Sequence, residues 1–261
     1  MKLKEVQVSA VIIAKNQQDN IKECIRTLDW VDEIVVVDTG SKDDTAKVAE
    51  RLGAKVFLTK TTSFSDWRNF GTRKANGKLI LHIDTDERST AEVAKEVMGL
   101  IDDTAGAYAI PRRNFILGKE MKHGGQWPDY VVHLLRKSNF EKWVGDLHEV
   151  PRYTGNLKHL KNPILHYKHD NLADMVEKTN GWSEIEAKLM FDSGHPTMTV
   201  LRFFSAMFRE FWLRMIRQAA FLDGPKGMIY AFYQVFSRFV SYAKLWEMQI
   251  NNSKFKIQKS K

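Results

Sequence analysis

The sequence has few of the residues that would cross-link the chain or divide it. It has one cysteine, Cys24, which excludes an internal disulfide framework. Cys24 falls on the apolar side of a predicted helix, and we expect it to fill the core in a reducing compartment. There are six prolines in 261 residues, and neither a low-complexity linker nor an internal repeat occurs. We therefore expect one generous domain, or a domain with an appendage.

Long apolar runs are also missing. No uncharged apolar run reaches the roughly 18 residues that a transmembrane helix requires. Residues Met1–Gln7 are too polar for a signal peptide, so we expect neither a leader nor a membrane span. The formal net charge of +8 permits acidic partners, and the position of the charges matters more than their sum.

The first part of the chain alternates between strand and helix patterns. Four strands are predicted, at Val6–Ala14, Ile34–Asp38, Lys55–Leu58 and a run ending at Asp84. Helical spacing of apolar residues separates them, and Ser41 with Asp44 suggests a capping box. Four such alternations predict a parallel sheet covered by helices on both faces.

The pattern changes after a helix predicted over Ser89–Ile101. Further strands, predicted to extend the sheet into a mixed one, are separated by glycine-containing loops and lie at Tyr108–Arg112, Val131–Arg136 and Pro163–Tyr167. From about Asn171 the chain is predicted to be helical, which gives an α/β domain at 1–170 and a helical region at 171–261.

Two aromatic segments of the helical region, Met198–Leu222 and Met228–Gln249, are predicted to form a hairpin. Between them, Asp223–Gly227 contains one proline and two glycines, which favour a tight turn.

A pair of aspartates, Asp84 and Asp86, ends the apolar run LILHI. Ligands of open α/β sheets bind at the carboxyl ends of the strands. Two carboxylates this close repel each other unless a positive charge lies between them, and a hard divalent cation that also binds phosphates supplies it. The alternative is an acidic turn that leads to a helix cap at Ser89.

Several stretches, in this order and spacing, resemble glycosyltransferase family 2. They are SAVIIAKNQQDNIKECI, DEIVVVDTGSKDDT, RNFGTRKANGKLILHIDTDER, QWPDYVVHLLRK, VGDLHE, FLDGPKG and YAKLWE. Together they span Ser9 to about Glu247. The resemblance implies the GT-A fold, a Rossmann-like mixed sheet flanked by helices, here with a C-terminal helical extension. More narrowly, the chain is similar to the bacterial subgroup that adds sugars to the lipopolysaccharide inner core.

The resemblance implies a UDP-sugar donor held with Mg²⁺ or Mn²⁺. The residues matching the donor motifs are Asp38 for the uracil or ribose, Arg68 and Asn69 for the diphosphate or base, Asp84 for the ribose and metal, and Asp86 and His166 for the metal. Other interpretations stay open, because Asp38 suits a turn, Arg68 suits an exposed helix face, and a lone histidine in an apolar strand is often a core residue.

On the acceptor side, the resemblance makes Glu149 the candidate base, with Asp146 as runner-up, because an inverting transferase must take a proton from the acceptor hydroxyl. A salt-bridged strand residue is the other interpretation of Glu149. The acceptor or sugar contacts implied are Trp127, Asp129 and His148, although Trp127 also suits a core. His133 stands where the family usually has arginine, which leaves a phosphate role there in doubt.

The tail interleaves arginine with aromatic residues, as in Arg202-Phe203-Phe204 and Arg209-Glu210-Phe211-Trp212. Basic, aromatic, amphipathic helices suit the surface of an anionic bilayer. We expect a cytoplasmic protein, peripheral on the inner face of the cytoplasmic membrane. Alternatively, the aromatics pack onto the catalytic domain and the cations only aid solubility.

The predicted function is an inverting, metal-dependent transfer of a hexose, by resemblance glucose, from a UDP-sugar to a heptose of the lipopolysaccharide inner core. A peptide or another glycolipid is an alternative acceptor. A processive polysaccharide synthase is disfavoured because no Gln-x-x-Arg-Trp motif occurs. A nucleotidyltransferase would need a Gly-rich first turn, and a basic nucleic-acid-binding protein lacks any supporting motif here.

Overall fold

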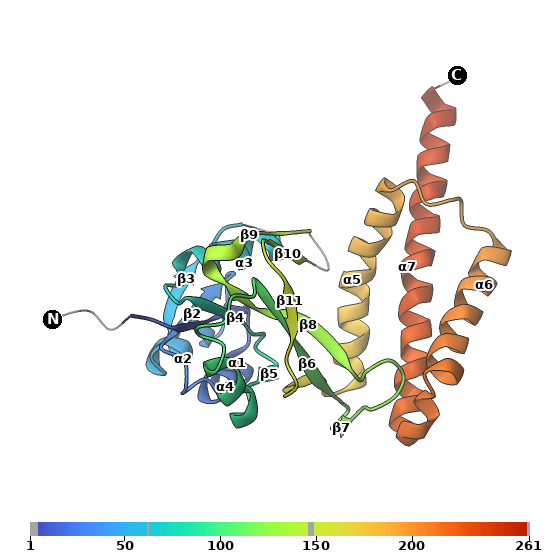
Figure 1. Cartoon of the computed structure of the whole chain (residues 1–261). Helices are drawn as coiled ribbons and strands as arrows, with labels where there is room; N and C mark the ends of the chain where they lie inside the picture. The colour runs from blue at the N-terminus through green and yellow to red at the C-terminus, as the bar shows by residue number, and fades with distance from the viewer. Residues whose placement is uncertain (1–4, 62, 146–148, 260–261) are drawn as a thin grey trace. The chain divides into compact units, whose positions relative to one another are not determined.

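The computed structural model describes residues 5–61, 63–145 and 149–259, with side chains described as far as Asn252. The chain divides into two compact units (Figure 1). The first consists of residues 1–113 and 128–167, and the second of residues 114–127 and 168–261. The sequence does not predict that the excursion 114–127 groups with the C-terminal helices.

The parallel half of the sheet is built from β1 (Val8–Ala14), β2 (Glu33–Asp38), β3 (Lys55–Leu58) and β4 (Leu79–His82). Their order is β3-β2-β1-β4, with β1 hydrogen-bonded in parallel to both β2 and β4. All four residues of β4 are buried, as are six of seven in β1. Strands covered on both faces explain the continuous apolar runs in the sequence.

Helices cover both faces of this sheet. Alternate residues of β1 pack in one cluster with Ile21, Cys24 and Leu28 in and just after α1 (Gln18–Arg26). The intervening Val11 faces the opposite side, towards α3 (Phe64–Lys74). There a Cβ on Gly71 would lie 2.4 Å from Val11 Cγ1, so only glycine lets the helix approach this closely.

The antiparallel half continues the same sheet. Next to β4 come β8 (Asp129–Arg136), β6 (Ala107–Ile116), β12 (Ile164–His169) and β5 (Glu87–Arg88). Strand β8 runs antiparallel to both β4 and β6. The predicted mixed α/β sheet is therefore confirmed, and the turn with Asp84 and Asp86 connects β4 to β5.

Four short strands lie beyond this path. β7 (Lys119–Glu120) and β11 (Leu157–His159) pair with β6. β9 (Phe140–Val144), which follows a 3₁₀ turn at Lys137–Asn139, forms a separate two-stranded sheet with β10 (Val150–Tyr153).

Two helix starts differ from the sequence interpretation. Helix α2 (Thr45–Arg51) follows Asp44, whose side chain does not cap it, and Ser41 Oγ instead accepts a hydrogen bond from the Asn16 N–H. The predicted capping box is therefore wrong. Helix α4 (Ala91–Met98) is capped by Thr90 rather than by Ser89, because the Thr90 hydroxyl accepts from the Val93 N–H.

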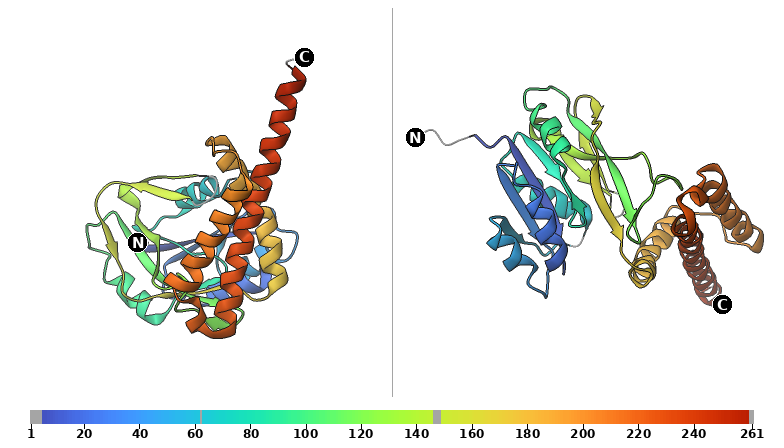
Figure 2. Two further views of the ribbon diagram at one scale, coloured as in Figure 1. Left: turned by 90° about the vertical axis from the view of Figure 1, so that its right-hand side faces the viewer. Right: turned by 90° about the horizontal axis from the view of Figure 1, so that it is seen from below.

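The second unit is helical. In it, α5 (Leu172–Asp192) and α6 (Val200–Phe211) both pack on α7 (Gly224–Lys259) (Figures 1 and 2). The turn between α6 and α7 is a π-helical segment at Trp212–Arg217 followed by a 3₁₀ turn at Ala220–Asp223. None of the helices that the structure describes combines the length and the apolar composition needed to cross a bilayer.

The segment Asp223–Gly227 was predicted as the hairpin turn, but most of it is helical. Gly224 and Pro225 begin α7, and proline is well tolerated in a first turn because its missing N–H would have no partner there. The buried Asp223 carboxylate accepts hydrogen bonds from the N–H groups of Lys122 and His123, and His123 Nδ1 lies 3.0 Å from its other oxygen. The motif thus fastens the excursion 114–127 to the start of α7.

A buried carboxylate, that of Glu33, joins the parallel strands of the first unit at their amino ends. Glu33 Oε2 accepts from Ser9 Oγ at 2.6 Å and from the Asn76 N–H at 2.7 Å, and Oε1 accepts from Lys55 Nζ at 2.8 Å. Burial opposes the charge, but the bonds from Lys55, Ser9 and Asn76 outweigh it and lower the pKa of Glu33 to about 2.

We predict that Glu33→Gln lowers the free energy of unfolding at neutral pH by roughly 2 kcal/mol, less than the whole pKa shift implies because Lys55 is exposed. A depressed folded-state pKa stabilises above the unfolded value, so the wild-type advantage should fade as the pH falls from about 4.5 towards about 2. Denaturant titrations over this range measure it. Glu23→Gln, which alters an exposed pair with Arg26, is the matched control, and an equal loss in both variants would refute the prediction.

Candidate functional site

The carboxyl ends of β2 and β4 carry three of the predicted residues. Asp38 ends β2, and Asp84 and Asp86 follow β4. Because β2 and β4 flank β1 and run parallel to it, these residues lie at the same edge of the sheet. The Asp84 N–H donates to Glu87 Oε2 at 2.9 Å, so the loop is held from beneath by the residue that follows the pair.

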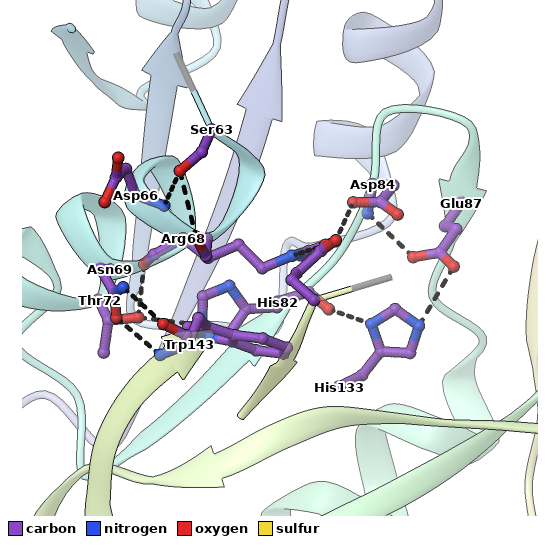
Figure 3. Close-up of polar contacts among 12 residues, drawn as sticks. Ser63, Asp66, Arg68, Asn69, Thr72, His82, Asp84, Glu87, His133 and Trp143 are labelled. Atoms are coloured by element: carbon purple, nitrogen blue, oxygen red, sulfur yellow. Dashed lines mark hydrogen bonds and ion pairs between the residues drawn. The ribbon is translucent and has the colours of Figure 1, made fainter. Parts of the chain in front are cut away.

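Arg68 bridges two carboxylates at this edge. It comes from α3, and its Nη2 donates to Asp84 Oδ1 at 3.2 Å (Figure 3). Its Nε donates to Glu149 Oε1 at 2.6 Å. The side chains of Arg68 and Glu149 are only 10% and 13% exposed, so these charges meet largely out of water. The structure therefore brings together the predicted base, the predicted donor arginine and the first aspartate of the pair.

The guanidinium of Arg68 is held by a rigid frame. Its Cζ lies 5.1 Å from the centre of the Trp143 ring, a cation–π distance. Asn69 accepts from the Trp143 N–H at 2.8 Å and donates to the Trp143 carbonyl at 3.0 Å, which locks α3 to β9 (Figure 3). Both polar atoms of the Asn69 amide are thus hydrogen-bonded to the backbone of Trp143. A contact between Asn69 and a nucleotide stays a prediction. Trp143 Nε1 in turn donates to His82 Nε2 at 3.3 Å.

A second buried network supports the aspartate loop, and the sequence gives little sign of it. Glu87 is fully buried, with His133 Nε2 at 3.3 Å and Arg112 Nη1 at 3.5 Å. His133 Nδ1 donates to the His82 carbonyl at 2.6 Å (Figure 3). His133, noted in the sequence only as a departure from arginine, therefore ties the end of β4 to Glu87. Apart from its charge, nothing in the sequence around Arg112 indicates a role at this site.

The two networks differ in their electrostatics. Burial, opposed by Arg68 and reinforced by Glu87 and Asp86, raises the pKa of Asp84. Burial also disfavours the charge of Glu87, but His133, His166 and Arg112 outweigh it and lower the pKa of Glu87. The loop thus has a carboxylate of lowered pKa beneath it, Glu87, and one of raised pKa at its rim, Asp84.

The predicted metal ligands meet in part. Asp86 Oδ2 and His166 Nε2 lie 3.7 Å apart, whereas the charge partner of Asp84 is Arg68. In the described part of the chain, no three His, Cys, Asp or Glu side chains gather as a metal site. A carboxylate and an imidazole nevertheless fit Mn²⁺, which accepts oxygen and nitrogen donors, better than Mg²⁺, which prefers oxygen.

Asp38 takes the turn role that the sequence left open. It is buried, and its Oδ1 accepts from the N–H groups of Gly40 at 2.9 Å and Ser41 at 2.8 Å. These bonds do not involve Oδ2, and a hydrogen bond from Asp38 to a nucleotide stays a prediction.

Of the remaining predicted residues, the structure describes Asp129 and Trp127. Asp129 begins β8 and pairs with Arg112 Nη2 at 2.7 Å, which links it to the network of Glu87. Trp127 belongs to the second unit and is 42% exposed, so it is not a core tryptophan. His148 and the runner-up base Asp146 lie outside the described residues.

The chain is similar to known proteins over most of its length. Residues 9–166 match the model of the family described as glycosyl transferase family 2. An uncharacterised glycosyltransferase of Rickettsia felis is 26% identical over 256 residues, which cover 92% of this chain and 90% of that protein. The lipopolysaccharide core biosynthesis glycosyltransferase LpsC of Rhizobium meliloti is 23% identical over 261 residues, or 93% of each chain.

Two solved structures are more distant. Staphylococcus aureus TarS 1–349 is 16% identical, with 92% of this chain and 88% of that chain covered and a TM-score of 0.45. Glucosyl-3-phosphoglycerate synthase from Mycobacterium tuberculosis, in complex with Mn²⁺, UDP and glucosyl-3-phosphoglycerate, is 23% identical over 41% of this chain and 44% of that chain, with a TM-score of 0.37. The family match covers more than half of the residues and includes the sheet edge with Asp38, Asp84, Asp86 and Glu149. The chain therefore belongs to glycosyltransferase family 2 and has the GT-A fold.

Proposed function

We propose that this protein is an inverting hexosyltransferase that moves glucose from UDP-glucose to a heptose of the lipopolysaccharide inner core. The observation that carries the proposal is the cluster in which Arg68 pairs with both Asp84 and Glu149 at the carboxyl edge of the sheet. The similarity to LpsC along 93% of both chains supports the acceptor class. Membership in the family favours a transferase over a basic nucleic-acid-binding protein.

The chemistry is a single displacement in which Glu149 acts as the general base. The acceptor oxygen forms a bond to the anomeric carbon, and the bond from that carbon to the UDP oxygen breaks, so that UDP leaves with the electron pair. The acceptor hydroxyl gives its proton to Glu149, whose carboxylate is oriented by the hydrogen bond from Arg68. The acceptor oxygen attacks the anomeric carbon on the face opposite the departing UDP, which inverts the anomeric configuration.

The donor would be held by residues at the same edge. Asp38 would accept a hydrogen bond from the uracil or ribose, and Asp84 would contact the ribose. Asp84, Asp86 and His166 would hold Mn²⁺ or Mg²⁺, which when bound neutralises the charge of the departing diphosphate. Asp129 and Trp127 are the proposed contacts to the acceptor or its sugar, with His148.

Helix α6 supports membrane association of the second unit. It packs the buried Ala206 and the half-buried Phe203 and Met207 against the other helices and exposes Leu201, Phe204 and Phe208. Beside this apolar face lie the exposed Arg202 and Arg209, and no acidic residue occurs between Asp192 and Glu210. An exposed aromatic face flanked by arginines suits anionic lipid headgroups. We propose a peripheral location on the inner face of the cytoplasmic membrane, where a lipid-linked acceptor would be met.

Removal of a proposed metal ligand tests the donor site. Asp86→Ala should lower the Mn²⁺-dependent release of UDP from UDP-glucose by about 100-fold or more, because the leaving diphosphate loses its counter-charge. Asp102→Ala, which removes an exposed carboxylate elsewhere, should leave the rate unchanged. Metal-dependent turnover that persists in Asp86→Ala would show that the ion binds elsewhere.

Neutralisation of the proposed base separates chemistry from binding. Glu149→Gln should lower kcat by about 100-fold to 10,000-fold, the usual contribution of a general base, and leave the Kd for UDP with Mn²⁺ within about threefold. Stopped assays of UDP release and calorimetry give the two quantities. The exposed Glu141→Gln is the control. Undiminished kcat in Glu149→Gln would reject this residue as the base.

The membrane proposal is tested on α6. Phe204 and Phe208 are 72% and 66% exposed, so the double variant F204S/F208S should fold normally. Its binding to phosphatidylglycerol vesicles should fall by about tenfold or more, because two buried rings are lost from the lipid contact. Leu58→Ser, on the equally exposed edge of β3, should bind as the wild type does. Equal binding by all three proteins would defeat the proposal.

A further inference from the structure

One edge of the Arg68 guanidinium donates hydrogen bonds to two different carboxylates. Arginine commonly donates two parallel hydrogen bonds from one edge to a single carboxylate. Here Nε serves Glu149 and Nη2 serves Asp84. Because Nε and Nη2 belong to one rigid planar group, the position of one carboxylate fixes that of the other.

We propose that Arg68 is a positioning residue for the general base, and that it couples Glu149 to the donor site through Asp84. This inference rests on the proposed function and gives Arg68 a task other than direct contact with the nucleotide. Arg68 holds Glu149 in place, and a cation bound to Asp84 would change how strongly Arg68 pairs with Glu149.

The balance of charge explains the coupling. Asp84, Asp86 and Glu149 are three carboxylates, and Arg68 is the cation in contact with two of them. If Asp84 held a cation together with the donor, that charge would take the place of Arg68 as its counter-charge. The guanidinium would then serve Glu149 alone, which would couple binding of the donor to the placement of the base.

The frame around Arg68 makes it suited to this task. The Trp143 ring lies against the guanidinium, and Thr72 Oγ1 donates to the Arg68 carbonyl at 2.7 Å. Asn69, the next residue in the chain, joins the same helix to β9. With the backbone and the flat face of Arg68 both held, the side chain cannot readily follow a partner that moves, and Glu149 is oriented by a fixed donor.

A double-mutant cycle tests the coupling. Arg68→Gln, Glu149→Gln and the combined variant are compared with the wild type for kcat of UDP-glucose hydrolysis with Mn²⁺ and for the Kd of UDP with Mn²⁺. If Arg68 acts through Glu149, Arg68→Gln should lower kcat by about 100-fold, and the combined variant should match Glu149→Gln within about threefold. The Kd for UDP with Mn²⁺ should not rise by more than about threefold in any variant, and it should fall in Arg68→Gln, which loses the guanidinium that competes with the cation for Asp84.

The outcomes are distinct. The inference would be overturned if the kcat of the combined variant fell by the product of the two single losses. It would also be overturned if the Kd for UDP rose about tenfold in Arg68→Gln while kcat stayed unchanged. Either result would make Arg68 an independent donor contact. A wild type that neither binds UDP with Mn²⁺ nor releases it from UDP-glucose would overturn the proposed function itself, and this inference with it. An active wild type with an additive cycle overturns the inference alone.

Two further variants guard against trivial losses. Arg73→Gln makes the same change on an exposed position of α3 and should leave both kcat and Kd unaltered. If Arg68→Gln leaves its acids unpaired and fails to fold, Arg68→Lys takes its place in the cycle. A lysine provides one charged point for two carboxylates, so kcat should still fall, by about tenfold, with the Kd for UDP retained. Unchanged kcat in Arg68→Lys would also overturn the inference.

Discussion

The site depends on an excess of negative charge that the protein satisfies only in part. Asp84 and Glu149 share the guanidinium of Arg68 at the end of β4, and Asp86 lies beside His166. Burial raises the pKa of Asp84. Such charges are costly away from water unless they are paired. A cation brought by a diphosphate would complete the pairing, so the binding energy of the donor and the relief of this repulsion come from the same contact.

The surrounding structure keeps that excess in place. Glu87 lies beneath the loop as a firmly ionised carboxylate, held by His133 and Arg112, and it accepts from the backbone of Asp84. Arg68 is held from the other side by Trp143. The bonds from Asp84 to Glu87 and to Arg68 thus hold this carboxylate and its loop in a defined arrangement.

Much of the fold follows from sequence pattern. The apolar runs of β1, β2 and β4 predict buried parallel strands, because only strands covered on both faces lack polar alternation. The pair Asp84 and Asp86 at the end of such a run predicts the functional edge. Helix starts were less predictable: Ser41 and Asp44 match a capping box, yet the Ser41 hydroxyl bonds across the turn to Asn16. Local patterns do not report such partners.

The contacts that organise the site were beyond sequence reasoning for the same reason. Arg68 and Glu149 are 81 residues apart, and Arg112 and Glu87 are 25 apart. Nothing in the local sequence of either partner specifies these pairs. The Asp223–Gly227 motif predicts a turn, yet most of it is helical, because Gly-Pro favours both a turn and the first turn of a helix. Its role in fastening residues 114–127 depends on the buried carboxylate of Asp223.

We propose that the acidic end of β4 takes up a cation shared with a nucleoside diphosphate. Pulsed electron paramagnetic resonance of Mn²⁺ with UDP and the full chain tests it directly. We expect a phosphorus coupling from the diphosphate together with a nitrogen coupling from His166, and we expect the nitrogen coupling to be lost in His166→Ala. A spectrum identical to that of Mn²⁺ and UDP in buffer would contradict it.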